Sequence, residues 1–155
     1  MISIFIPIRK GSKRIINKNI KSLPKFKFGL TELKLKQLEK LKKMLKKEIS
    51  QPVEFIVSTD SEKIIKYLKR YKWIDVKKKS RSLATDNSLD KLIKHVPQVC
   101  KGNFILWTHV TSPLFQHSDY VEFIKIFLKK NKKNKVKSAF SANKIQKFLF
   151  RKKDK

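Results

Sequence analysis

The sequence is poor in cysteine, glycine and long apolar segments. Only one of its 155 residues is cysteine and only three are glycine. The single Cys100 excludes an internal disulfide and a zinc site built from cysteines, and no activating partner for its thiol is evident. No apolar run approaches the roughly 18–20 residues that cross a bilayer, and the apolar residues 1–8 precede charges without a small-residue cleavage site. We therefore expect a reduced, cytoplasmic protein with no membrane partner.

Acidic residues are also scarce, with 12 Asp and Glu against 40 Lys and Arg, which gives a formal net charge of +28. Such a charge suits the phosphates of a nucleic acid. However, only five of the basic residues are arginine, the side chain of bidentate phosphate and base recognition, and the 35 lysines are spread along the whole chain. We favour a solvated lysine coat, and a basic nucleic-acid-binding module remains the alternative function.

The apolar pattern predicts strands that alternate with helices. With 40% hydrophobic residues and 11 Phe, the chain can bury a core, and its length suits a single domain over residues 1–155. Alternation of this kind predicts a mainly parallel sheet covered on both faces, that is, a Rossmann-like three-layer α/β fold. Strands are expected at 2–8, 53–58, 73–76, 104–107 and 136–142, and helices at 30–47, after 59, at 88–96 and from 118.

Several helix details follow from local signals. Thr59 and Glu62 have the spacing of a capping box, Pro97 is expected to end a helix, and Asp119 suits the positive N-terminal end of the last helix. In the helix 30–47, lysines are expected on the face opposite the apolar stripe, and Leu35 falls outside that stripe. The stripe consists of Leu30, Leu33, Leu38, Leu41, Met44 and Leu45.

In parallel sheets, ligands gather beyond the carboxyl ends of the strands, so the loops after the strands carry most of the functional information. The loop after the first strand contains Arg9, Gly11, Lys18 and further basic residues. Its glycine lets the backbone approach an anion that flanking cations neutralise, which suits a polyphosphate; the alternative is an ordinary basic turn. Neither the GxxxxGK[ST] nor the GxGxxG pattern is present.

Four segments in order resemble the acylneuraminate cytidylyltransferases, also called CMP-sialic acid synthetases. The first is residues 6–20, with IPIRKGSKRI followed by KNI; the others are VSTDSE at 57–62, LATDNS at 83–88 and VTSPL at 110–114. The resemblance covers nearly all of the chain. It implies transfer of a cytidylyl group from CTP to an acidic nine-carbon sugar, with release of pyrophosphate. The close alternatives are CTP-dependent activators of Kdo, pseudaminic acid or legionaminic acid.

The resemblance also implies roles for individual residues. Arg9 and Lys18 match positions that meet the CTP phosphates and carry the catalytic charge, Gly11 and Ser12 offer backbone N–H groups, and Asn19 contacts the nucleotide. Cytosine is expected to be read by Lys79 or Arg81, with Ser88 nearby, although Ser88 also suits a helix cap. The sugar would be held by His109, Thr111 and Ser112.

Members of this family carry metal-binding carboxylates in an Asp-x-Asp arrangement, much of the sugar pocket and the dimer contact further along the chain. The resemblance thus implies Mg²⁺ as cofactor and a homodimer for a full-length chain, but the sequence offers no carboxylate pair at that spacing. We therefore expect a C-terminally truncated member that binds nucleotide and turns over slowly or not at all. Exposed sheet edges and apolar surface then predict poor solubility.

Overall fold

The computed structural model describes residues 1–12, 14–80 and 89–142. The chain divides into two parts, residues 1–122 and 123–155. The first part holds the sheet, three helices and the start of a fourth, and the described portion of the second holds the rest of that helix and residues 133–142. No helix of the described residues is long and apolar enough to cross a membrane.

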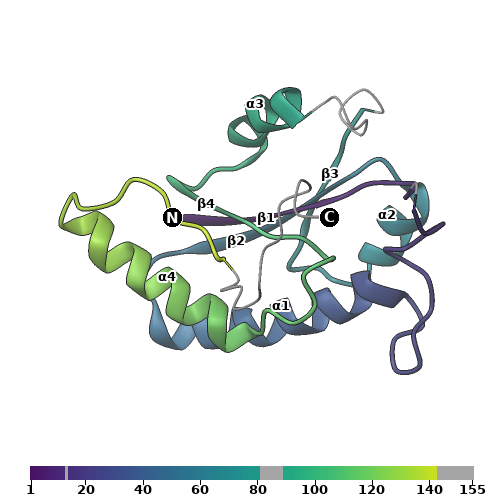
Figure 1. Cartoon of the computed structure of the whole chain (residues 1–155), viewed down its shortest axis with the longest axis horizontal. Coiled ribbons are helices and arrows are strands. Elements are labelled where there is room, and N and C mark those ends of the chain that lie inside the picture. Colours follow the sequence, from purple (N-terminus) through teal and green to yellow (C-terminus); the bar gives the residue numbers. More distant parts are fainter. Residues whose placement is uncertain (13, 81–88, 143–155) are drawn as a thin grey trace, which may run out of the picture. The chain divides into compact units, whose positions relative to one another are not determined.

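Four strands form one parallel sheet in the order β3-β2-β1-β4 (Figure 1). The predicted strand 2–8 is confirmed as β1 (Ile2–Ile8), with β2 (Val53–Thr59) on one side of it and β4 (Phe104–Trp107) on the other. β3 (Asp75–Lys78) begins two residues later than expected. The strand order and the covering helices confirm the α/β, Rossmann-like fold.

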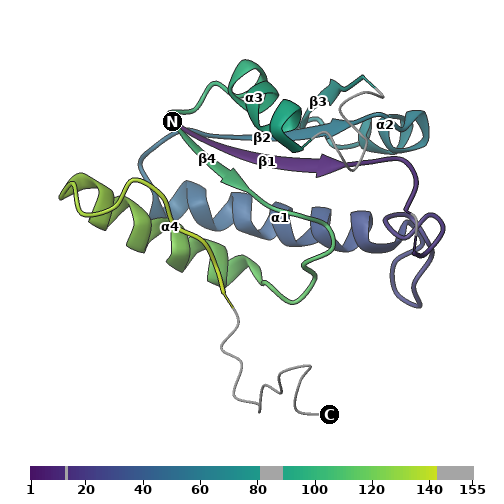
Figure 2. The same cartoon turned by 45° about the horizontal axis from the view of Figure 1, so that its top comes forward.

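Helices cover both faces of this sheet (Figure 2). On one face lies α1 (Gly29–Glu48), and on the opposite face lies α3 (Leu89–Val99), where Val96 packs with Phe5 of β1 and Ile56 of β2. Because successive strand residues point to opposite faces, Ile4 and Ile6 lie on the side of α1, and both are fully buried.

The polarity of α1 differs from the expected pattern at two positions. Leu35, predicted to lie outside the apolar stripe, is only 1% exposed, and Lys34 is completely buried although lysines were expected on the outer face. Lys34 stands four residues after Leu30 and four before Leu38, a spacing that places it on the same side of the helix as these leucines. α1 is thus buried over a wider arc than its six-residue stripe suggested.

The predicted capping box at the start of α2 (Glu62–Leu68) is wrong. The N-cap is Ser61, whose hydroxyl accepts a hydrogen bond from the Ile64 N–H at 3.4 Å. Thr59 belongs to β2 and its hydroxyl accepts the N–H of Ser61, while Glu62 forms an ion pair with Lys78. Both residues therefore act locally, but in a turn and an ion pair.

Two further element predictions are wrong. Pro97 lies inside α3, which continues to Val99, so the helix accommodates a residue without an N–H in its last turn. Residues 136–142 form no strand in the described part of the chain, because they follow α4 (His117–Lys132) without pairing to the sheet. At the start of α4, Asp119 accepts the Gln116 N–H at 2.7 Å, as its predicted role at this helix end requires.

Candidate functional site

The register of the sheet places the ends of three strands side by side. Ile8 pairs with Thr59, and Thr59 pairs with Lys78. The next residue on each strand is therefore Arg9, Asp60 or Lys79, and these three lie at the same edge of the sheet. An acid between two cations at the carboxyl ends of parallel strands is an arrangement that suits an anionic ligand.

The loop after β1 leaves this edge in a conformation that favours glycine. Gly11 has a φ of +77°, and a Cβ built on it meets nothing within 4 Å, so the backbone angle and not a steric contact favours glycine here. The loop is tied to β2 because the Lys10 N–H donates to the Asp60 carboxylate at 2.7 Å. Ser12 follows, half-buried. The expected glycine turn is therefore present, on the strand end that carries Arg9.

Asn19 is the most firmly held residue of this loop. Its side-chain Nδ2 donates to the Arg9 carbonyl at 3.3 Å, and its own carbonyl accepts from both the hydroxyl and the N–H of Thr31 in α1. Its Oδ1 is buried without a hydrogen-bond partner among the described residues. A buried acceptor without a partner costs free energy, so it is a position where a ligand donor would be stabilised. Lys18 directly precedes Asn19, half-buried in the same turn.

Lys79 is buried at the end of β3, with only 5% of its surface exposed. Its N–H donates to the Thr59 carbonyl, which continues the pairing of β3 with β2. Burial lowers the pKa of Lys79, Asp60 counteracts this by stabilising the charged form, and the positive charge of Arg9 lowers the pKa further. The two cations thus lie near enough to repel each other, and a bound anion would relieve that repulsion.

The turn after β4 forms the other side of this edge. Phe5 pairs with Trp107, and the Thr108 N–H donates to the Phe5 carbonyl, so His109 leaves the sheet beside β1. His109, Thr111 and Ser112 are exposed, and the Ser112 N–H closes the turn on the His109 carbonyl at 3.2 Å. Desolvation by surrounding protein atoms, and then the charge of Lys34, lower the pKa of His109. The imidazole is therefore neutral at neutral pH and able to donate and accept hydrogen bonds.

Sequence reasoning missed Lys34, which supports this turn from α1. Its Nζ donates to the Ser112 carbonyl at 2.9 Å and to the Tyr120 hydroxyl at 3.1 Å. Burial lowers the pKa of Lys34 to about 8. Three residues further along α1, Gln37 donates to the Pro113 carbonyl at 2.7 Å. The one available signal was the position of Lys34 between Leu30 and Leu38 on the apolar side of its helix.

A comparison with protein families shows which family the chain belongs to. The profile described as "Cytidylyltransferase" matches residues 3–152, nearly the whole chain. The chain belongs to the cytidylyltransferase family. No curated protein matches it significantly. Family membership implies a CTP-type nucleotide as a substrate of this chain.

Two residues predicted to line the nucleotide site of this cytidylyltransferase lie outside the described residues. They are Arg81 and Ser88, on the segment that also carries the LATDNS motif. Of the two candidates for reading cytosine, Lys79 is thus the one whose place is known, at the end of β3. Arg81 remains a prediction.

The magnesium ion expected for this cytidylyltransferase was tested against the described side chains. Across residues 1–12, 14–80 and 89–142, no group of three or more His, Cys, Asp or Glu is placed to hold a metal ion. Asp60, the carboxylate at the three strand ends, accepts the Lys10 N–H and interacts with Lys79. Magnesium prefers carboxylate and phosphate oxygens in octahedral geometry. Among the described residues, no cluster of three or more ligands is thus present to hold the ion without substrate phosphates.

Proposed function

We propose that this member of the cytidylyltransferase family activates an acidic nine-carbon sugar of the sialic-acid type with CTP, giving a CMP-sugar and pyrophosphate. The anomeric hydroxyl attacks the α-phosphorus, the bond to the bridging oxygen of the β-phosphate breaks, and that oxygen leaves with pyrophosphate. Such a transfer needs positioning and charge neutralisation and little covalent participation by the protein.

The observation that carries this proposal is the meeting of Arg9, Asp60 and Lys79 at the ends of three neighbouring strands, beside the glycine turn. Two cations held close together favour a polyanion such as a triphosphate. Lys18 is proposed to place its charge near the α-phosphate, where negative charge develops during the transfer. Asn19, fixed to Arg9 and α1 by its hydrogen bonds, would present its unpaired Oδ1 to a donor of the nucleotide.

The sugar is proposed to bind at the turn after β4. This turn leaves the same edge of the sheet on the other side of β1, and it offers the imidazole of His109 and the exposed hydroxyls of Thr111 and Ser112. Sugar hydroxyls are bound by side chains that both donate and accept hydrogen bonds, as these do. The adjacent Lys18-Asn19 pair favours the sialic-type branch of the family, and it does not distinguish among the nine-carbon sugars.

The proposal is tested by formation of CMP-sugar from CTP and sialic acid with wild-type protein, Lys18→Ala and Lys25→Ala. Lys25 is an exposed lysine seven residues away and serves as the matched control. We expect turnover to fall at least ~100-fold in Lys18→Ala and to stay within about twofold in Lys25→Ala. Unchanged turnover in Lys18→Ala would contradict the assignment. If the wild-type chain binds CTP without turnover, the Kd for CTP is compared among the same three proteins. We then expect the affinity to fall about tenfold in Lys18→Ala and not in Lys25→Ala.

A basic nucleic-acid-binding module is the second candidate, supported by the net charge of +28. It predicts salt-sensitive binding that is indifferent to the base, with no preference for CTP. The arrangement at the three strand ends favours the enzyme, because it concentrates two of the cations at one edge of the sheet.

A further inference from the structure

A cavity lies between the start of α1 and helix α2, with a volume of about 520 Å³. This is within the usual size range of small-molecule sites. Its lining contains none of the residues of the proposed CTP site or of the turn after β4. It is lined by Lys27, Phe28, Glu32, Lys63, Lys66, Tyr67 and Arg70.

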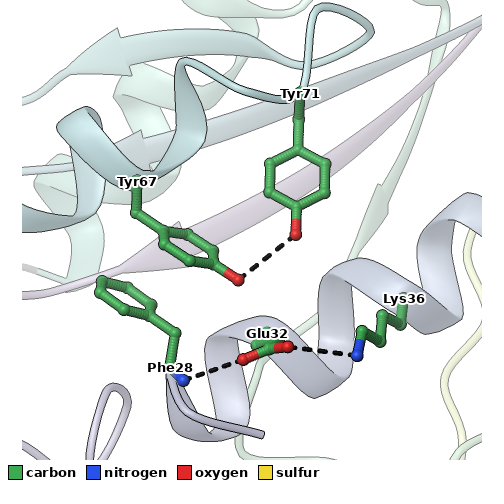
Figure 3. A network of polar contacts seen from close by, with 5 residues as sticks. All are labelled: Phe28, Glu32, Lys36, Tyr67 and Tyr71. Carbon is green, nitrogen blue, oxygen red and sulfur yellow. Dashed lines mark hydrogen bonds and ion pairs between the residues drawn. The ribbon is translucent and has the colours of Figure 1, made fainter.

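One wall of this cavity is a rigid aromatic pair. The rings of Phe28 and Tyr67 are stacked, with centroids 3.8 Å apart and an angle of 2° between their planes. Figure 3 draws both side chains. The Tyr67 hydroxyl is 3.3 Å from that of Tyr71, which fixes the ring at its polar end. The Arg70 guanidinium lies 4.2 Å from the centroid of the Tyr67 ring. A guanidinium stacked on a ring keeps its N–H groups directed outward along its edge, ready to bind an anion.

The lining of the cavity carries an excess of positive charge. Four of its seven lining residues are basic, and the only acid is Glu32. Glu32 already accepts the Phe28 N–H at 2.9 Å and forms an ion pair with Lys36 at 3.1 Å (Figure 3), and these contacts lower its pKa. Among the described residues, no ion pair joins any of the four basic lining residues to a carboxylate. Glu32 attracts Arg70, and Glu62 attracts Lys66, so carboxylates offset the positive charge of the lining only in part.

We propose that this cavity is a second anion site, which binds a small molecule carrying several phosphate charges. Three lysines and one arginine surround a single concave volume. This charge matches a ligand that carries several negative charges better than a ligand that carries one carboxylate. The fork of Arg70 matches two phosphate oxygens at once, while the lysines act as point charges around the remaining ones. The aromatic pair gives the site an apolar wall against which these interactions are less screened by water. The proposal does not depend on the reaction assigned to the other site.

The test is a titration of the whole ¹⁵N-labelled chain with tripolyphosphate, followed by NMR. We expect shifts at the amides of residues 62–71 and at the Arg70 side chain, in addition to any at residues 9–19. The variant Lys63→Gln/Arg70→Gln should bind tripolyphosphate at this site about tenfold or more weakly, since it loses two charge-assisted contacts. Arg70→Lys, which keeps the charge but not the fork, should show a smaller loss.

The matched control is Lys40→Gln/Lys43→Gln, which removes two exposed charges from α1 away from the cavity. It should change the affinity by less than about twofold. An equal loss in both double variants would overturn the proposal, because binding would then follow net charge. Shifts confined to residues 9–19 would also overturn it. So would a single-stranded RNA that shifts residues 62–71 when tripolyphosphate does not, since the cavity would then be part of a nucleic-acid surface.

Discussion

Lys34 in α1 donates a hydrogen bond to the main-chain carbonyl of Ser112, at 2.9 Å, and so joins a helix to a turn 78 residues away in sequence. Gln37 makes a parallel contact to the Pro113 carbonyl. The ammonium group of Lys34 is fully buried, and the other partner given by the structure is the Tyr120 hydroxyl, not a carboxylate. A buried cation held by neutral oxygens is costly, which marks this turn as one whose position matters.

Replacing Lys34 should therefore affect the sugar more than the nucleotide. In Lys34→Met the turn that carries Thr111 and Ser112 loses one of its two anchors to α1. We expect the KM for the acidic sugar to rise about fivefold or more, the equivalent of one hydrogen bond, and the KM for CTP to stay within about twofold. Lys43→Met, an exposed lysine on the same helix, is the control. Equal changes in both KM values would show that Lys34 does not act through the turn.

The buried lysine also predicts a pH dependence of stability. The folded-state pKa of Lys34, about 8, is below its ordinary value of 10.5, so between these values the unfolded chain binds more protons. The free energy of unfolding of wild type, relative to Lys34→Met, should thus rise by about 1–3 kcal/mol from pH 7.5 to pH 9.5. The neighbouring His109 titrates below this window, and burial raises the pKa of Tyr120 from 10, above it. A constant or falling difference in urea unfolding would contradict the prediction.

The stability of two variants distinguishes the Ser61 N-cap of α2 from the capping box of Thr59 and Glu62 that the sequence suggested. Ser61→Ala should lower the free energy of unfolding by about 1 kcal/mol, because the Ile64 N–H loses its acceptor. Glu62→Gln should change it by less than about 0.5 kcal/mol, since its ion pair with Lys78 is exposed. Thermal unfolding of both variants measures which one is the less stable. A larger loss of stability in Glu62→Gln than in Ser61→Ala would favour the capping box.

Gly11 should matter for the ligand more than for the fold. Alanine at a φ of +77° is strained by about 1 kcal/mol, but the exposed loop can relax because no neighbouring atom confines it. We expect Gly11→Ala to weaken CTP binding roughly three- to tenfold with little change in Tm. The comparison of Kd and Tm in one preparation tests this, and a large fall in Tm with unchanged affinity would refute it.

Much of the fold could be predicted from the sequence, because β1, β2 and β4 are short apolar runs and α1 has a clear helical period. The errors lie where several local signals compete. Thr59 and Ser61 are both able to cap a helix, and only the extent of β2 decides between them. At Pro97, the sequence does not decide whether the helix ends before the proline or continues past it.

Part of the candidate site could also be predicted, because some of its residues belong to one local sequence pattern. Arg9, Gly11 and Asn19 were predicted from a motif that is continuous in sequence, and in the structure the Asn19 side chain donates a hydrogen bond to the Arg9 carbonyl. Lys34 was missed because its role depends on Ser112, a contact between distant segments that no local pattern encodes. The position of Arg9 and Lys79 at the same edge of the sheet likewise follows from the register of three strands, which is known only once the sheet is formed.

The most direct test of the account is a calorimetric titration of CTP, UTP, ATP and GTP into the whole chain at about 150 mM salt with Mg²⁺, where unspecific charge effects are screened. The central claim is that the edge formed by Arg9, Asp60 and Lys79 holds the triphosphate of CTP. It predicts that CTP binds more tightly than the other three nucleotides by about tenfold or more, and that this high-affinity binding is lost in Arg9→Ala. Equal affinities for all four nucleotides, or an Arg9→Ala variant that binds CTP like wild type, would contradict it.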